Sequence, residues 1–468
     1  MPRCVLALLT ALCLCAPTLA LGQAAAPPAP PKPVLAPTAD VATKVETYLR
    51  AQARVNRFSG TVLVARDGAP IVSSGYGWAN AEWEVPNTPA TKFRLGSITK
   101  QFTATLVLRL QEQKKLTVQD PICTYLTPCP DVWKPITIHH LLTHTSGIPS
   151  YTGLPDYQKT MMVPKTIEQM VAVFRDLPLE FAPGEKFKYN NSGYFLLGVI
   201  IEKVAGKKYD EALRDEIFVP LGMKDTGYDW SEPLLPRRAS GYTRKGDTWV
   251  NAKFLDMQQP YSAGSLYSTV EDLLKWDQAL YTDRVLPPAA RTAMFTPFKD
   301  GYAYGWAVQP AEKAPSGHVQ VSHGGGINGF ATMIQRVPDD RVTVIVLSNV
   351  DNINTGAIAR DVMAINYSLP YQVPIERTSI TVNPSVLEQY VGRYQIAPDF
   401  ILTVTLEGNQ LMTQATGQNK LEVFAESETR FFLKVVDAQL TFAKGEDGKV
   451  SHVTLHQGGV DRKAPKIP

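Results

Sequence analysis

Hydrophobic residues recur every three or four positions in several segments of the chain, a spacing that is typical of helices with one buried face. The pattern predicts helices at residues 40–54, 95–113, 136–142 and 166–174. A capping-box pattern at residues 268–271 opens a further helix that ends near residue 280. In the segment at residues 40–54, the apolar residues on one face are Val41, Val45 and Leu49. In the segment at residues 95–113, they are Ile98, Phe102, Leu106 and Leu110.

Other segments have the apolar pattern of strands. Residues 60–65 and 70–75 flank an Arg-Asp-Gly turn, which predicts a hairpin, and residues 342–347 (VTVIVL) predict a buried strand. Beyond residue 370, apolar residues alternate with polar ones, so we expect an all-β module at residues 371–468, a small barrel or sandwich. Helices and strands therefore mix without the regular alternation of a doubly wound sheet.

The charge balance narrows the class of protein. The 468 residues include 47 Lys and Arg against 44 Asp and Glu, a formal net charge of +3. Because a dedicated nucleic-acid binder usually has a strongly basic face, nucleic acid is not an expected partner. After the first 25 residues no apolar run reaches ~18 residues, so no membrane span is expected once the N-terminus is removed. The length allows two or three domains.

The N-terminus predicts export. Arg3, the apolar stretch that follows it and the small residues near residue 20 are typical of a signal peptide, which we place at residues 1–22. A membrane anchor is the alternative, but Pro17 and the short apolar stretch count against it. Residues 23–38 are mostly Ala and Pro, which favours an extended tether that does not pack. We therefore expect a periplasmic or secreted protein.

Export changes the interpretation of the cysteines. Three of the five lie in the predicted signal peptide, which leaves Cys123 and Cys129. In an exported chain this close pair can form a disulfide, and two free thiols are the other possibility because spacing does not decide the geometry. Neither cysteine belongs to a Cys/His motif, so a catalytic thiol is not expected.

Candidate chemistry begins at the sequence Ser97-Ile98-Thr99-Lys100. A serine hydroxyl is a poor nucleophile until a base removes its proton, and a lysine three residues later on a helix lies on the same face. Such a lysine can be the base if burial lowers its pKa from the usual ~10.4. By itself the Ser-x-x-Lys pattern also fits two solvated side chains on a helix surface.

Two further segments add possible partners. Tyr189 and Asn191 follow a Pro-Gly turn, and they could relay a proton and bind a substrate amide, or simply belong to a buried tyrosine cluster. His323 precedes three glycines on a predicted strand edge, where a ligand backbone could approach closely. The amide of Gly326 could then donate to an oxyanion. A second His-x-Gly pattern begins at His456, so the pattern is not specific without its position.

Taken in this order, these residues resemble the serine β-lactamase and penicillin-binding-protein-related hydrolase family, in particular its class C-like branch of DD-peptidases, D-aminopeptidases and esterases. The resemblance implies an α/β (α+β) hydrolase domain at residues 39–370, with an antiparallel sheet flanked by helices and a helical subdomain. The module at residues 371–468 resembles the lipocalin-like appendages of some such hydrolases. Further matching segments are residues 87–93, 141–149 and 183–198.

The resemblance also implies roles for the candidate residues. Ser97 is then the acylated nucleophile, Lys100 its proton acceptor and Tyr189 the acid or base partner. The reaction is a two-step acyl transfer without cofactor or metal, and the substrate is a small molecule or peptide. The amides of Ser97 and Gly326 form the oxyanion hole. The substrate-binding and oxyanion set implied by the resemblance is Asn191, His323, Gly324, Gly325 and Gly326.

One departure from the family pattern bears on the substrate. Members that hydrolyse β-lactams typically have Lys-Thr-Gly where this chain has His323, Gly324 and Gly325. A largely neutral imidazole is a weaker carboxylate anchor than a lysine, so an esterase or peptidase acting on small esters or D-amino-acid peptides is favoured. A β-lactamase that opens β-lactam rings and a non-catalytic peptidoglycan-binding or sensor protein are the alternatives. The oligomeric state is not predicted.

Some residues suggest other sites. His139, His140 and His144 resemble a metal cluster, but no Glu completes a His-Glu-x-x-His motif, so we interpret them as structural polar groups around the following turn. Tyr302 and its neighbours Tyr304 and Trp306 could line a substrate cleft, and a packed core is slightly favoured. The basic residues near the C-terminus are interpreted as solvated.

Overall fold

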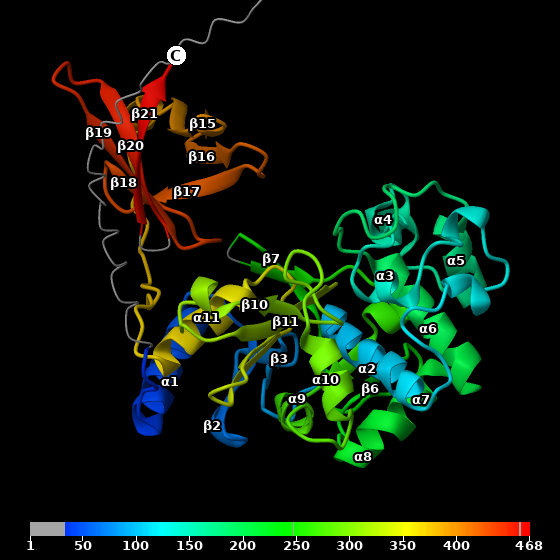
Figure 1. Ribbon diagram of the computed structural model, residues 1–468. Helices are drawn as coiled ribbons and strands as arrows, with labels where there is room; N and C mark the ends of the chain where they lie inside the picture. The colour runs from blue at the N-terminus through cyan, green and yellow to red at the C-terminus, as the bar shows by residue number, and fades with distance from the viewer. Residues whose placement is uncertain (1–32, 247, 458–459) are drawn as a thin grey trace, which may run out of the picture. The chain divides into compact units, whose positions relative to one another are not determined.

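The computed structural model describes residues 33–246, 248–457 and 460–468 (Figure 1). The predicted signal peptide and residues 23–32 of the predicted tether lie outside the described residues. Among the described helices, none is both long and apolar enough to cross a bilayer.

The domain predicted at residues 39–370 contains an antiparallel sheet of six strands in the order β10-β11-β12-β13-β1-β2. The predicted hairpin forms its β1 and β2, and the predicted buried strand is β13, which pairs with β1. The strands are β1 (Gly60–Arg66), β2 (Ala69–Tyr76), β10 (Ala307–Gln309), β11 (Gln320–Ile327), β12 (Phe330–Val337) and β13 (Val342–Ser348). The expected antiparallel sheet flanked by helices is therefore confirmed.

Strand β1 shows why both faces of this sheet are covered. All its residues from Gly60 to Ala65 are buried, and successive side chains point to opposite faces. Val62 and Val64 pack into the core that contains α1 (Thr38–Arg54) and α11 (Thr355–Asn366), whereas Leu63 faces the core that contains α2 (Thr99–Glu112) and α9 (Val270–Ala279). A strand buried on both faces is apolar along almost its whole length, and the predicted buried strand β13 (VTVIVL), which pairs with β1, shows the same pattern.

The remaining helices form the helical part of the domain and the cover beside α2. They are α3 (Ile138–Leu142), α4 (Tyr157–Thr160), α5 (Ile167–Arg175), α6 (Asn191–Ala205), α7 (Tyr209–Leu213), α8 (Val219–Leu221) and α10 (Pro288–Phe295). Thr137 and Thr166 cap α3 and α5 with their side chains, so these helices begin later than predicted. The cap of α9 is Thr269, which accepts from the Asp272 amide, and the predicted box at residues 268–271 is wrong by one residue.

Short strands pair beside these elements. A three-stranded sheet in the order β5-β9-β6 joins the approach to Ser97 with distant segments of the chain. The short strands are β3 (Trp78–Asn80), β4 (Val85–Pro86), β5 (Phe93–Arg94), β6 (Gly227–Tyr228), β7 (Tyr242–Lys245), β8 (Thr248–Asn251) and β9 (Leu266–Ser268).

The described end of the predicted tether packs, contrary to expectation. Ala36 is buried, its amide donates to the Asn366 carbonyl at 2.8 Å, and its carbonyl accepts from Arg66 Nη1 at 3.0 Å. The following residue, Pro37, precedes the first turn of α1. An Ala/Pro composition disfavours a core of its own, but it does not prevent single small residues from filling a space beside other elements.

The C-terminal module is a closed barrel of eight described strands, β14 to β21, as the alternating pattern allowed. Its interior is filled by side chains such as Tyr394, Val404 and Phe442, so it is a packed core. The strands are β14 (Gly392–Ala397), β15 (Phe400–Glu407), β16 (Gln410–Ala415), β17 (Leu421–Ala425), β18 (Arg430–Phe432), β19 (Ala438–Lys444), β20 (Val450–Gln457) and β21 (Val460–Ile467). Helix α12 (Pro384–Glu388) precedes them.

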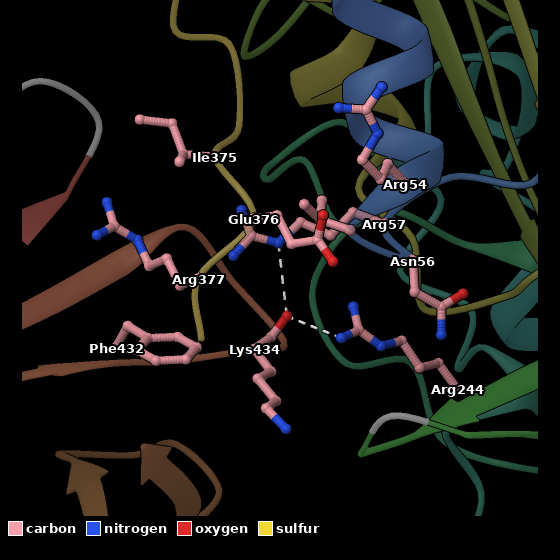
Figure 2. A pocket seen from close by; sticks show the side chains of 10 residues that line it. Arg54, Asn56, Arg57, Arg244, Ile375, Glu376, Arg377, Phe432 and Lys434 are labelled. Carbon is pink, nitrogen blue, oxygen red and sulfur yellow. Dashed lines mark hydrogen bonds between the residues drawn. The ribbon is translucent and has the colours of Figure 1, made fainter. Parts of the chain in front are cut away.

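Two arginines outside the barrel, Arg57 and Arg244, bind backbone carbonyls of the barrel. Arg57 Nε and Arg244 Nη2 both donate to the Lys434 carbonyl, at 3.5 and 2.8 Å, as Figure 2 shows. Arg57 also donates to the carbonyls of Leu433 and Val436. A cavity of about 250 Å³ lies beside these contacts. Arginine suits this role because its planar fork can reach several acceptors from one buried stem.

The two cysteines that follow the predicted signal peptide form a disulfide. Cys123 and Cys129 are bonded, and their Cα atoms are 5.4 Å apart. The bridge closes a short loop before α3, which settles the alternative that the sequence left open.

Candidate active site

Ser97 lies in a tight turn rather than inside a regular helix. The predicted helix at residues 95–113 is divided into a 3₁₀ turn, η1 (Gly96–Ile98), and α2, which begins at Thr99. Gly96 has a φ of +55°, a conformation that favours glycine. A Cβ on Gly96 would lie only 2.9 Å from the Gly326 nitrogen, so this turn packs directly against β11.

Lys100 is at the centre of the site. Its Nζ lies 3.1 Å from Ser97 Oγ, 2.8 Å from Asn191 Oδ1 and 2.9 Å from the Ala263 carbonyl oxygen. The residue is fully buried, and this burial holds the pKa of Lys100 well below its usual range. A lysine that is neutral near pH 7 can accept a proton.

The hydrogen bonds define where the free electron pair of the neutral amine points. A neutral amine has two N–H donors and one lone pair. Asn191 Oδ1 and the Ala263 carbonyl can only accept, so they take the two donors. The lone pair is then left for the third neighbour, Ser97 Oγ, which is the arrangement a general base needs.

The surrounding backbone fixes both acceptors. Asn191 Nδ2 donates to Thr152 Oγ1 at 3.0 Å, which leaves Oδ1 to face Lys100. Ala263 ends the 3₁₀ turn η6 (Tyr261–Ala263), in which Tyr261 has a left-handed φ of +43°. Ser262 Oγ anchors this turn by donating to the Tyr194 carbonyl at 2.8 Å. The second acceptor is therefore held by strained backbone that its neighbours stabilise.

Tyr189 completes the group of residues around Ser97. It lies on the loop before α6, with 37% of its surface exposed, and Lys100 Nζ is 4.8 Å from the centre of its ring. Loss of part of its water contact raises the pKa of Tyr189 above its usual value, and a hydrogen bond with Ser97 acts in the opposite direction. The phenol is therefore protonated near pH 7 and can donate its proton.

His144 has a role in this geometry that the sequence did not reveal. Its Nδ1 accepts from the Asn190 amide at 3.0 Å, and its ring lies 4.2 Å from the ring of Tyr189, centre to centre. Burial holds the pKa of His144 well below its usual range, so the ring is neutral. The histidine thus supports the segment that carries Tyr189 and Asn191. No spacing pattern links residue 144 to residue 189, so this contact had no signal in the sequence.

The three glycines of β11 differ in their surroundings. A Cβ on Gly325 would lie 1.9 Å from the Leu95 carbonyl oxygen, whereas a Cβ on Gly326 would have no heavy atom within 4 Å. Thr332, which pairs with Gly325, donates from Oγ1 to the same Leu95 carbonyl at 2.8 Å. Strand β11 is thereby held against the Ser97 turn, with the Gly326 amide beside Gly96.

His323 is buried on the same strand, in contact with Tyr302. Its Nε2 lies 2.9 Å from Tyr302 Oη, and its Nδ1 lies 2.6 Å from the Gly324 carbonyl oxygen. Burial, followed by repulsion from the protonated form of Lys100, lowers the pKa of His323 to about 4, so the imidazole is neutral at pH 7. The structure therefore brings together Ser97, Lys100, Tyr189 and the glycine strand, which the sequence placed in three separate segments.

Other candidates lie elsewhere or are structural. His139 Nδ1 is 2.8 Å from Tyr304 Oη, and His140 completes the capping box of α3. Tyr304 and Trp306 are buried in the core, as the favoured interpretation had it. His456 belongs to the barrel, where it pairs with Asp461.

The comparisons with known proteins agree with this geometry. Residues 45–365 match the Beta-lactamase family. The chain belongs to the beta-lactamase family. Residues 376–464 match a domain of unknown function, DUF3471. As a member of this family of serine hydrolases, the protein is an enzyme, and the expected fold and family are confirmed.

The relatives of this beta-lactamase-family chain include penicillin-binding proteins and a teichoic acid D-alanine hydrolase. Penicillin-binding protein 4* of Bacillus subtilis is 32% identical over 448 residues, covering 90% of this chain and 97% of the relative. A teichoic acid D-alanine hydrolase of Staphylococcus aureus is 30% identical over 274 residues, covering 57% and 66%. The octameric penicillin-binding protein homologue from Pyrococcus abyssi has a TM-score of 0.64 at 26% identity, covering 90% and 99%.

A solved D-stereospecific amidohydrolase from Streptomyces sp. is also similar. Its TM-score is 0.57 at 26% identity, and the match covers 71% of this chain and 98% of that one. The similar proteins thus carry names that refer to penicillin binding, to D-alanine hydrolysis and to D-stereospecific amide hydrolysis.

Proposed function

We propose that this protein is an exported serine hydrolase that cleaves small esters or amides through an acyl-enzyme on Ser97. The observation that carries the proposal is the position of buried Lys100, 3.1 Å from Ser97 Oγ with two obligate acceptors on its other side. Because burial lowers the pKa of Lys100, this arrangement places a base beside the Ser97 hydroxyl.

The acylation step uses the groups around Ser97. Ser97 Oγ attacks the substrate carbonyl carbon while its proton passes to Lys100 Nζ, and the bond to the leaving group then breaks. Tyr189 donates its phenolic proton to the leaving alcohol or amine and regains a proton from Lys100. The amides of Ser97 and Gly326 stabilise the negative charge that develops on the carbonyl oxygen.

The deacylation step reverses these proton transfers. A water molecule attacks the acyl carbon and transfers a proton to the pair formed by Tyr189 and Lys100. Ser97 regains its proton from Lys100, and the free acid leaves. Neither step calls for a metal or cofactor, because the reaction needs only a nucleophile, a base, an acid and an oxyanion hole.

The substrate class rests on two supports. Two relatives are named for hydrolysis of D-alanine from teichoic acid and for D-stereospecific amide hydrolysis, which favours D-amino-acid esters and amides of the cell wall. His323 stands where β-lactam-hydrolysing members typically have a lysine. The disulfide between Cys123 and Cys129 and the pattern of residues 1–22 support export to the periplasm or outside the cell.

The match of residues 45–365 to the Beta-lactamase family favours one second candidate, a β-lactamase. It differs from the first in the lifetime of the penicilloyl adduct. A non-catalytic peptidoglycan-binding or sensor protein would form no Ser97 adduct with any acyl donor.

Intact-mass spectrometry tests the proposal. The mature protein, Ser97→Ala and the surface control Ser231→Ala are incubated with p-nitrophenyl acetate and with a penicillin. We expect an acetyl adduct and release of p-nitrophenol in wild type and Ser231→Ala but not in Ser97→Ala. A penicilloyl adduct that turns over quickly would shift the function to a β-lactamase. Equal labelling of Ser97→Ala and wild type would refute the role of Ser97.

A further inference from the structure

The contacts of His323 determine which of its nitrogens carries the proton. The Gly324 carbonyl oxygen, 2.6 Å from Nδ1, can only accept, so Nδ1 is protonated. In a neutral imidazole Nε2 is then an acceptor, and the Tyr302 hydroxyl, 2.9 Å away, donates to it. Both nitrogens of His323 are thereby engaged inside the protein.

Tyr302 is itself held in place. The preceding Gly301 has a φ of +73°, and a Cβ on it would lie 2.9 Å from the Val308 carbonyl oxygen. The Tyr302 amide donates to the Lys299 carbonyl at 2.9 Å, and its ring lies 4.6 Å from the ring of His144, centre to centre. The hydroxyl of Tyr302 is thus directed at His323 by a turn with little freedom to move.

We propose that Tyr302 is a specificity-determining residue, which locks His323 in a form that cannot bind a carboxylate, so that the enzyme selects leaving groups without one. This inference rests on the proposed function and narrows its substrates to esters and amides with neutral leaving groups. Such leaving groups are alcohols, the hydroxyl groups of a polymer and the amidated C-terminal part of a D-peptide. Tyr302 acts here through His323 and is not a catalytic residue.

Two routes by which His323 could bind a carboxylate are both unfavourable. The ring can turn Nε2–H toward substrate only by giving up its contacts with the Gly324 carbonyl and the Tyr302 hydroxyl, which removes the acceptor at which this buried hydroxyl is directed. It can become an imidazolium only while buried, with Lys100 nearby. Tyr189, the other titratable group in ring contact with it, is protonated and supplies no negative charge.

The test compares two substrates that differ only in the charge of the leaving group. N-acetyl-D-alanyl-D-alanine carries a free carboxylate, and its C-terminal amide carries none. We expect wild type to favour the amide by at least about tenfold in kcat/KM, the size of effect that a charge-assisted hydrogen bond produces. Tyr302→Phe should reduce this ratio through a lower KM for the free acid, and His323→Lys should reverse it.

Tyr304→Phe is the matched control. It removes a hydroxyl from a buried tyrosine two residues away, which contacts His139 rather than His323. We expect it to leave the substrate ratio unchanged. Equal ratios for Tyr302→Phe and Tyr304→Phe, or a wild type that favours the free acid, would overturn the inference.

A spectroscopic measurement keeps the inference testable if Tyr302→Phe does not fold. Long-range ¹H–¹⁵N correlation spectra of wild type, assigned with His323→Lys, report the imidazole tautomer. We expect the neutral Nδ1–H form at pH 7, and the Nε2–H form or an imidazolium would overturn the lock. If Ser97 is not acylated by any substrate, the proposed function fails, whereas acylation without discrimination between the two peptides refutes only the role of Tyr302.

Discussion

Gly325→Ala is expected to impair catalysis much more than Gly326→Ala, although both glycines lie on β11. A Cβ at position 325 would lie 1.9 Å from the Leu95 carbonyl oxygen and 2.2 Å from Thr332 Oγ1. The backbone of Gly325 is not left-handed, so alanine is compatible with its conformation and only the lack of space opposes it. The substitution therefore tests the packing of β11 against the Ser97 turn.

The size of the effect follows from the geometry. Because Cβ atoms essentially never approach another heavy atom within 3.0 Å, β11 must move from Leu95 by at least about 1.1 Å. The amides of Ser97 and Gly326 lie on the two elements that separate. A displacement of about 1 Å can cost ~10²-fold, and loss of an oxyanion donor costs ~10²–10³ in rate. We expect kcat/KM for p-nitrophenyl acetate to fall within that range.

Gly326→Ala is the comparison, because it keeps the amide and places its Cβ in open space. We expect a loss of less than about tenfold in this variant. Far-ultraviolet circular dichroism and thermal unfolding should show that both variants fold, although Gly325→Ala also disturbs the Thr332 hydrogen bond and loses about 1–3 kcal/mol of stability. A folded Gly325→Ala enzyme with near-wild-type kcat/KM would refute the assigned packing.

Three further predictions concern other parts of the molecule. Catalysis needs neutral Lys100, and burial lowers the pKa of this lysine. In a pH profile of kcat/KM, activity should therefore be full above the lowered pKa and fall as the pH drops through it. A fall in activity at the usual lysine pKa would contradict this expectation. Reduction of the protein should add the mass of two hydrogens by opening the bridge between Cys123 and Cys129, and an unchanged mass would contradict the bridge. Asp277→Asn should lower the free energy of unfolding by about 3–5 kcal/mol in urea titrations, because it strands the buried guanidinium of Arg336; a change below about 1 kcal/mol would contradict a dry ion pair.

Much of the secondary structure could be predicted from local pattern. The hairpin of β1 and β2 and the strand β13 follow from period-two or continuous apolar runs, and α1 follows from period 3.6. The errors fall at boundaries. Residues 96–98 form a 3₁₀ turn instead of the start of a helix, because tertiary packing against β11 overrides the helical pattern there.

The candidate site was predictable as residue types but not as an arrangement. The family resemblance indicated Ser97, Lys100 and Tyr189, and the structure brings these residues together. The Ala263 carbonyl could not be predicted, because any residue type offers a carbonyl and only the strained turn directs this one at Lys100. His144 was interpreted as structural because no Glu completes a His-Glu-x-x-His motif, and its contacts with Tyr189 and the Asn190 amide connect segments that no sequence pattern links.

The sequence alone determined most of the local elements, because these follow from residue type and short-range spacing, and its resemblance to a known family indicated the class of chemistry. The tertiary structure decided what those groups can do. Burial sets the pKa of Lys100, and the contact between Tyr302 and His323 sets the tautomer of the imidazole. Both effects depend on the surroundings of a group, and those surroundings are assembled from segments far apart in the chain.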